Sequence, residues 1–181
     1  VLGLPVFRFY DIDNAEATTL TGQDLIKFTE TITNHYYNKE LGDKKDYCIY
    51  TDTDSVFYPA LPLVQKRYPD ADVSDDEFMT KQILLVAKEV QDYINKGYDY
   101  FANKFLNVKG GHRFDIKQEC VAKSAFWVTK KRYGQWIIND GGIKCDKLDV
   151  KGLDIVKSNF PPAMRDLMTK VLKDILADVD K

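Results

Sequence analysis

Residues 47–58 read YCIYTDTDSVFY and carry the clearest structural signal in the chain. Both ends of this stretch are rich in aromatic and β-branched residues, which fit the pleated surface of a strand. The centre, Asp52-Thr53-Asp54-Ser55, consists of residue types that favour turns. The pattern therefore predicts two strands joined by a tight turn.

Asp52 and Asp54 should lie together at the tip of this predicted hairpin, where both carboxylates can project into solvent. Neighbouring carboxylates repel each other, so a cation or a turn hydrogen bond is needed to keep them close. Mg²⁺ suits such a pair because it takes few carboxylates and fills its other positions with water and phosphate oxygens. On these four residues alone, a purely structural Asx-type turn is the commoner explanation, and a metal site is the alternative.

A long helix is predicted before the hairpin. Asp13 and Glu16 have the spacing of a capping box, and apolar residues then recur at helical intervals. The helix should end before Gly42. After the hairpin, residues 59–73 contain prolines and are interpreted as a connector.

A second long helix and several strands are predicted in the middle of the chain. Ser74 and Glu77 form a second capping box, and Gly97 should end or bend the amphipathic helix that follows. Residues 113–138 are interpreted as extended strands. Residues 139–142, NDGG, indicate a hairpin turn.

A last helix is predicted after Pro161-Pro162, and it should continue to the final residue, Lys181. Its expected apolar seam is Met164, Leu167, Met168, Val171, Leu172 and Ile175. Together the elements predict an α+β fold in which long helices pack on one face of an antiparallel sheet.

Charge is distributed unevenly along the 181 residues. The net charge of −2 argues against a free-standing, non-specific nucleic-acid binder. However, residues 104–132 hold eight basic residues and two acidic ones, whereas residues 70–92 hold seven acidic residues and two lysines. The basic stretch could meet phosphates, although a solvated surface is the commoner explanation for such a run taken alone.

The cysteines and histidines indicate the redox compartment of the protein and argue against a zinc site. Three cysteines with no C-x-x-C spacing favour free thiols in a reducing compartment, so we expect a cytoplasmic protein. Only two histidines are present, His35 and His112, and we expect no zinc site. No apolar run reaches the roughly 18 residues that a membrane span needs, so no membrane partner is expected.

Four segments, in order, resemble family-B DNA polymerases. YTDTDS at residues 50–55 resembles the YGDTDS signature of that family, and KKRY at residues 130–133 matches a second element. FRFYD, NAEA and TGQ, within residues 7–23, resemble the segment that joins the fingers to the palm. KGLD and KS, within residues 151–158, resemble the start of the thumb. The resemblance covers nearly the whole chain and reverses the interpretation of Asp52 and Asp54 as a plain turn.

The resemblance implies a fold and a set of domains. Residues 1–150 would be the C-terminal part of the polymerase palm, with the end of the fingers connection at 1–20. Residues 151–181 would begin the thumb. A viral or phage branch of the family is implied, in which case the compartment is the host cytoplasm.

The resemblance also implies a metal site. Asp54 would be the principal ligand bridging two Mg²⁺ ions, for which Mn²⁺ could substitute, and Asp52 would be its companion acid. Glu119 is open to two interpretations, an auxiliary acid near the site or an ion pair with a neighbouring lysine. Thr51 stands where the family has glycine, which implies that the backbone there approaches DNA less closely.

The implied partners are primer–template DNA, deoxynucleoside triphosphates and the rest of a polymerase. Lys130, Lys131, Arg132 and Tyr133 would hold the duplex near the growing end. The family's D-x-x-S-L-Y-P and K-x-x-x-N-S-x-Y-G elements are absent from this sequence, and the chain starts at Val1. We therefore expect a polymerase fragment that is inactive alone. The alternative is a natural split subunit or relic that acts as a duplex-binding or assembly module.

Overall fold

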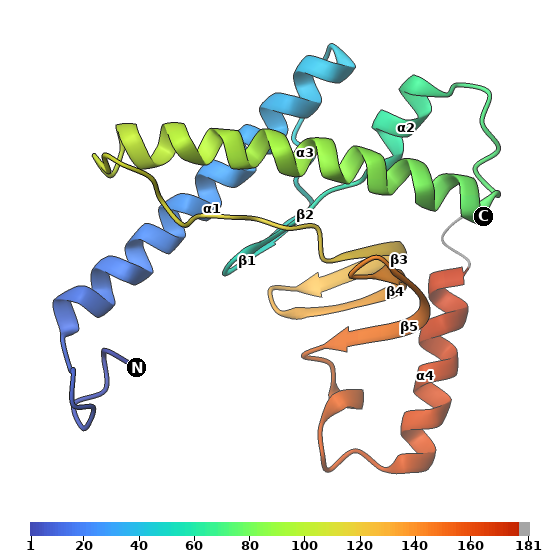
Figure 1. Cartoon of the computed structure of the whole chain (residues 1–181). Helices are drawn as coiled ribbons and strands as arrows, with labels where there is room; N and C mark the ends of the chain where they lie inside the picture. Colours follow the sequence, from blue (N-terminus) through green and yellow to red (C-terminus); the bar gives the residue numbers. More distant parts are fainter. Residues whose placement is uncertain (178–181) are drawn as a thin grey trace. The chain divides into compact units, whose positions relative to one another are not determined.

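The computed structural model describes residues 1–177, which form two compact units (Figure 1). Unit 1 comprises Val1–Asp75 and Leu85–Lys117, and unit 2 comprises Asp76–Leu84 and Gln118–Lys181. Each unit contains helices and one antiparallel sheet, so the predicted α+β class is confirmed. Among the described residues the strands fall into two separate sheets, whereas the sequence analysis expected one.

Unit 1 begins with helix α1, Ile12–Leu41. Its N-cap is Asp11, whose backbone is extended and whose carboxylate accepts the Asn14 N–H at 3.0 Å. The predicted start at Asp13 was therefore wrong by one half-turn, because Asp13 already lies inside the helix. The predicted end is confirmed, since Gly42 adopts a left-handed φ of 78° directly after the last turn.

The hairpin strands β1, Tyr50–Asp52, and β2, Ser55–Phe57, follow α1 in unit 1. The short helix α2, Leu61–Arg67, then forms within the segment that had been interpreted as a connector. Pro62 lies in its first turn, where the missing N–H of proline leaves no bond unmade. The proline that suggested a loop thus helps to begin a helix.

Helix α3 spans Asp76–Lys104, and its residues from Leu85 onward belong to unit 1. The predicted cap at Ser74 was wrong by one residue, because α3 begins at Asp76 and its N-cap position is therefore Asp75; the Ser74 hydroxyl donates to Asp72 Oδ1 at 2.6 Å. Gly97 neither ends nor visibly interrupts the helix. A Cβ at Gly97 would collide with the side chain of Ile32, so glycine permits the close approach of α1 and α3.

The core of unit 1 is aromatic and aliphatic, with two buried threonines on α1. Thr29 and Thr33 are fully buried, and each hydroxyl donates to a carbonyl one turn earlier in the helix. The Thr29 hydroxyl also lies 2.8 Å from the Tyr98 hydroxyl, which links α1 to α3. Other core side chains are Tyr37, Leu63, Val64, Val86, Val90, Ile94 and Phe101.

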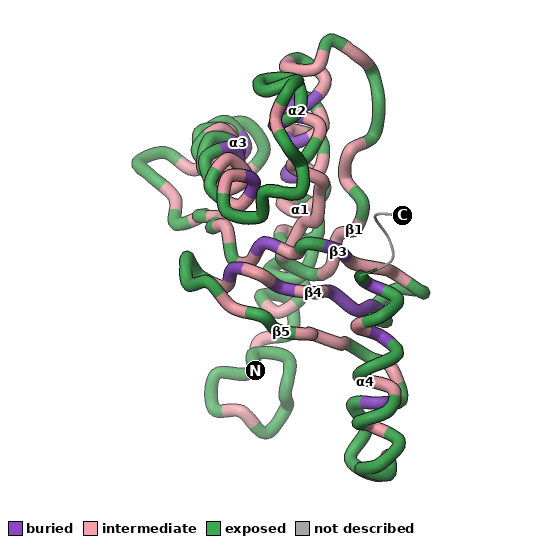
Figure 2. The backbone as a smooth tube through the Cα atoms, turned by 90° about the vertical axis from the view of Figure 1, so that its right-hand side faces the viewer, coloured by how far each residue is buried: buried purple, intermediate pink, exposed green. Residues whose placement is uncertain are grey.

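Unit 2 contains the sheet β3-β4-β5, formed by Cys120–Thr129, Arg132–Asp140 and Ile143–Lys151. Buried residues follow β3 and β4 (Figure 2). The predicted turn at residues 139–142 is confirmed, with left-handed φ values of 57° at Gly141 and 89° at Gly142. The prediction of strand over residues 113–119 was wrong, because these residues form no strand and β3 begins only at Cys120.

Helix α4, Pro162–Ala177, packs against β3 and β4 after a short 3-10 turn at Asp154–Val156. Leu172 and Leu176 are buried, whereas four residues of the expected seam are exposed: Met164, Leu167, Val171 and Ile175. The expected seam was right at Leu172 and wrong at these four residues, because apolar residues occupy more than one side of this helix and periodicity alone could not select the buried one. Residues 178–181 of the predicted helix lie outside the described residues.

None of the helices in the described part of the chain combines the length and the apolar character needed to cross a lipid bilayer.

Candidate active site

The predicted hairpin is confirmed in unit 1. Strands β1 and β2 pair antiparallel, with Tyr50 opposite Phe57 and Asp52 opposite Ser55. This register leaves a two-residue turn of Thr53 and Asp54. The acidic pair therefore lies at the very tip, where the sequence analysis placed it.

The conformation of the tip is restrained by its own hydrogen bonds. The Asp54 N–H donates to the Asp52 carbonyl at 2.6 Å, and the Ser55 hydroxyl donates to the same carbonyl at 3.1 Å. Thr53 has a φ of 53°, a left-handed conformation that is uncommon for a β-branched residue. Such strain persists only where the surroundings impose it, and it is concentrated at functional sites.

Neither carboxylate of the pair is buried in the core. Asp54 is exposed, and Asp52 is half-buried with its Oδ1 accepting the Thr53 hydroxyl at 3.0 Å. Within residues 1–177 no three His, Cys, Asp or Glu side chains gather into a metal-binding group. Two accessible carboxylates nevertheless fit Mg²⁺, which is commonly held by one or two carboxylates together with substrate phosphates and water.

The hairpin stem is attached to helix α1 by two side chains that the sequence analysis did not single out. Asn34 Oδ1 accepts the Tyr47 N–H before β1, and the Tyr37 hydroxyl donates to the Pro59 carbonyl after β2. The helical pattern placed both residues correctly on α1. It gave no signal for their partners, because tertiary packing brings those partners to the helix.

Cys48 lies at the base of β1 and is half-buried with a free thiol. Burial is the largest cause that raises the pKa of this thiol, to about 11. The thiol is therefore protonated at neutral pH and is a poor nucleophile or metal ligand. A half-buried thiol of this kind packs as a small hydrophobic residue.

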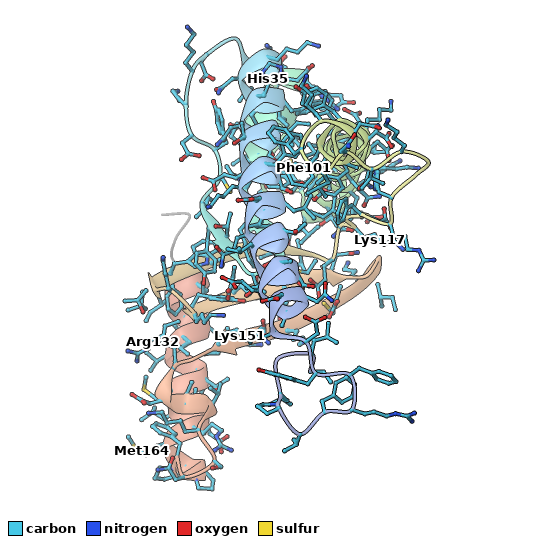
Figure 3. All side chains as sticks on the ribbon, turned by 90° about the vertical axis from the view of Figure 1, so that its left-hand side faces the viewer. His35, Phe101, Lys117, Arg132, Lys151 and Met164 are labelled. Carbon is cyan, nitrogen blue, oxygen red and sulfur yellow. The ribbon has the colours of Figure 1, made fainter. Side chains whose placement is uncertain are left out.

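The basic element, residues 130–133, belongs to unit 2: Lys130 and Lys131 form the turn between β3 and β4, and Arg132 is the first residue of β4. Lys130, Lys131 and Arg132 are all exposed; Figure 3 labels Arg132. Lys131 has a left-handed φ of 63°. A Cβ on Gly152 would collide with the Lys131 carbonyl oxygen, so the backbone after β5 closely approaches the turn. The element presents three cationic side chains to solvent.

Tyr133 and Glu119 differ from the other predicted site residues. Tyr133 is only 8% exposed, and its ring centroid lies 6.3 Å from that of Trp127. Tyr133 therefore packs in the interior of unit 2. Its contact with DNA stays a prediction. Glu119 is exposed just before β3, and its backbone carbonyl accepts the Gly141 N–H at 2.8 Å. Both interpretations of the Glu119 side chain stay open.

Comparisons with known proteins identify relatives along nearly the whole chain. The DNA-directed DNA polymerase of Escherichia phage RB69 is 27% identical over 98% of this chain, and that of Enterobacteria phage T4 is 25% identical over 98%. The DNA polymerase of Thermococcus kodakarensis is 27% identical over 96% of the chain. No family model matches the chain.

The chain spans about a fifth of the length of the two phage relatives, 21% in each case, and 8% of the archaeal one. The similarity therefore concerns one segment of these polymerases. The predicted resemblance is confirmed: over almost its whole length, this chain is homologous to a segment of DNA-directed DNA polymerases.

Proposed function

We propose that this chain supplies part of the nucleotidyl-transfer site of a DNA-directed DNA polymerase. The observation that carries the proposal is the exposed Asp54 beside Asp52, on a conformationally restrained hairpin tip, in a chain homologous to DNA polymerases. In the reaction the 3′-hydroxyl of a primer attacks the α-phosphate of a deoxynucleoside triphosphate. A new phosphodiester bond forms, and pyrophosphate leaves.

Asp54 and Asp52 are the proposed ligands of Mg²⁺, with Mn²⁺ as a substitute. When bound, the metal ions would lower the pKa of the primer hydroxyl and neutralise charge on the phosphates. Asp54 is the more accessible carboxylate and takes the role of principal ligand. Asp52, whose carboxylate accepts a hydrogen bond from the Thr53 hydroxyl, is the proposed second ligand beside Asp54. The restrained tip holds both groups close to their working positions, so less conformational freedom is lost on binding.

Lys130, Lys131 and Arg132 are the proposed contacts to primer–template DNA. They are exposed at one turn and carry three positive charges. Such side chains neutralise phosphates without reading sequence, which suits an enzyme that must copy any template.

The rest of the polymerase would supply the other elements of the site. Two carboxylates cannot hold both metal ions in line, so we propose that the chain does not polymerise by itself. The proposed division is palm over residues 1–150, with the fingers connection ending in 1–20, and thumb from residue 151 onward. A cytoplasmic location, in a host cell if the source is a virus, completes the proposal.

An experiment on the full-length protein tests the metal role. Asp54→Ala should reduce the single-turnover rate of nucleotide addition by more than about 100-fold, because even outer-shell partners of a metal contribute 10–100-fold. The dissociation constant for primer–template DNA should change little. The matched control is Asp24→Ala, an exposed aspartate on α1. Full activity of the Asp54→Ala protein contradicts the proposal.

The second candidate is a duplex-binding or assembly module without chemistry. It is favoured only by the three exposed cationic side chains of the β3–β4 turn. Duplex binding by the isolated chain, measured over a range of salt concentrations, distinguishes the two. A module predicts strong, salt-sensitive binding that is lost when Lys130, Lys131 and Arg132 are all replaced by alanine.

A further inference from the structure

Two side chains of helix α1 form hydrogen bonds with the backbone at the two ends of the hairpin stem. Asn34 Oδ1 accepts the Tyr47 N–H at 2.7 Å, just before β1. The Tyr37 hydroxyl donates to the Pro59 carbonyl at 2.9 Å, just after β2. Both hydrogen bonds are made by the part of α1 where His35 is labelled in Figure 3. One face of one helix therefore holds the two chain segments that enter and leave the hairpin.

The spacing and packing of the two side chains suit this role. Residues three apart lie on the same face of a helix, one turn apart. Tyr37 has no exposed surface, and its ring centroid lies 5.0 Å from that of Tyr47 and 5.5 Å from that of Tyr58. The ring thus contacts the residues on either side of the hairpin. Asn34 makes a second bond, from Nδ2 to Asp46 Oδ1 at 2.8 Å.

The hairpin needs such an external support. Each strand has three residues, and isolated two-stranded hairpins are marginally stable in water. The tip fixes its own local shape, but the direction in which the tip points depends on the stem. A small tilt of the stem displaces Asp54 relative to the rest of the site, and a displacement of about 1 Å can reduce a reaction rate roughly 100-fold.

We propose that Asn34 and Tyr37 are positioning residues that aim the hairpin tip, by clamping both ends of its stem to α1. The inference rests on the proposed function of Asp54. Neither residue touches substrate or metal. Their hydrogen bonds act through the backbone at Tyr47 and Pro59, and so set where the carboxylates lie within unit 1.

The Tyr37 hydroxyl is suited to act as a constant donor. Burial, the largest cause, raises the pKa of Tyr37 above its usual value. The hydroxyl therefore keeps its proton at every pH at which a polymerase works, and the bond to Pro59 is not switched by pH.

The test uses Tyr37→Phe in the full-length protein, because phenylalanine keeps the ring packing and removes only the hydroxyl. We expect the maximal rate of nucleotide addition to fall about tenfold or more. The Mg²⁺ concentration at half-maximal rate should rise several-fold, whereas the KM for nucleotide and the affinity for DNA should change little. Asn34→Ala should change both quantities in the same direction, and alanine preserves the helical propensity of α1 at this position.

Tyr98→Phe is the matched control. It removes a tyrosine hydroxyl that also bonds to α1, at Thr29, but lies away from the hairpin stem. Both tyrosine variants should show similar small decreases in melting temperature, and only Tyr37→Phe should change the Mg²⁺ dependence. Normal rates and Mg²⁺ dependence in both Tyr37→Phe and Asn34→Ala overturn the proposal, as do equal losses in Tyr98→Phe.

The result remains separable from the test of the metal role. An inactive Asp54→Ala protein together with normal Tyr37→Phe and Asn34→Ala proteins removes the positioning role and leaves the proposed function in place. An active Asp54→Ala protein removes the proposed function itself.

Discussion

Thr53 and Lys131 share an uncommon backbone conformation at the tips of two different hairpins. Their φ values are 53° and 63°, and left-handed backbone costs an ordinary L-residue about 1–2 kcal/mol. Glycine or asparagine would reduce that cost. Instead, the chain has a threonine between the two aspartates and a lysine in the basic turn. At both tips, therefore, the residue present is not the type that this backbone conformation favours most.

Replacing Lys131 should separate stability from DNA binding. Lys131→Asn places a residue that tolerates the left-handed conformation at this turn, and we expect unfolding free energy to rise by about 0.5–1 kcal/mol. Duplex affinity should fall, with the slope of log affinity against log salt reduced by about one. Urea unfolding and salt-dependent binding measure the two effects.

Lys130→Asn is the matched control. It also removes one positive charge from the turn, but Lys130 does not have a left-handed φ. It should weaken duplex binding without the gain in stability. An equal gain in both variants would show that strain at Lys131 is not its source.

Helices α1 and α3 pack closely against each other at Gly97. Gly97 lies inside α3 opposite Ile32 of α1, where a Cβ would collide. Gly97→Val should destabilise unit 1 by about 1–3 kcal/mol through overpacking. Ile32→Ala in the same chain should recover part of that loss. Thermal unfolding of the single and double variants gives the coupling energy, and additive effects would argue against direct contact.

The contact between α2 and α3 should depend on pH. Arg67 donates to both carboxylate oxygens of Glu89, at 3.0 and 2.5 Å, and this hydrogen bonding is the largest cause that lowers the pKa of Glu89 from 4.5. A lowered folded pKa means that the pair stabilises the protein above about pH 4.5. That contribution is lost as pH falls through the folded pKa.

Glu89→Gln should therefore destabilise the protein more at pH 7 than near pH 3. Both side chains are partly exposed, so the difference at pH 7 should be about 1 kcal/mol or less. Urea unfolding of both proteins at the two pH values measures it. A difference that persists unchanged at pH 3 would show that the ion pair is not the cause.

Sequence patterns predicted elements best where a local signal was unambiguous. The hairpin, the end of α1 at Gly42 and the turn at residues 139–142 depend on residues adjacent in the chain, and all three were predicted. The start of α3 was missed by one residue, because the capping-box spacing indicated Ser74 and the helix begins at Asp76. On α4, burial of Leu172 was predicted but that of Leu176 was not, because only the sheet beneath the helix selects its buried face.

Sequence motifs, and not hydrophobic periodicity, predicted the similarity of this chain to DNA polymerases. The ordered resemblance of YTDTDS and KKRY to polymerase elements identified the relatives that the comparisons then confirmed. Individual residues were less predictable. Asp54 and Lys131 are exposed, as a ligand and a DNA contact should be, but Tyr133 is buried. The hydrogen bonds of Asn34 and Tyr37 to the hairpin stem depend on tertiary contacts that no motif encodes.

Binding of divalent metal by the hairpin carboxylates can be measured by electron paramagnetic resonance of Mn²⁺ bound to the full-length protein with primer–template DNA and an unreactive nucleotide. We expect about two tightly bound ions in the unmodified protein. With Asp54→Asn, at least one ion should be lost or bound at least about tenfold more weakly. If the number and affinity of bound Mn²⁺ ions are unchanged in Asp54→Asn, the carboxylate of Asp54 is not a metal ligand.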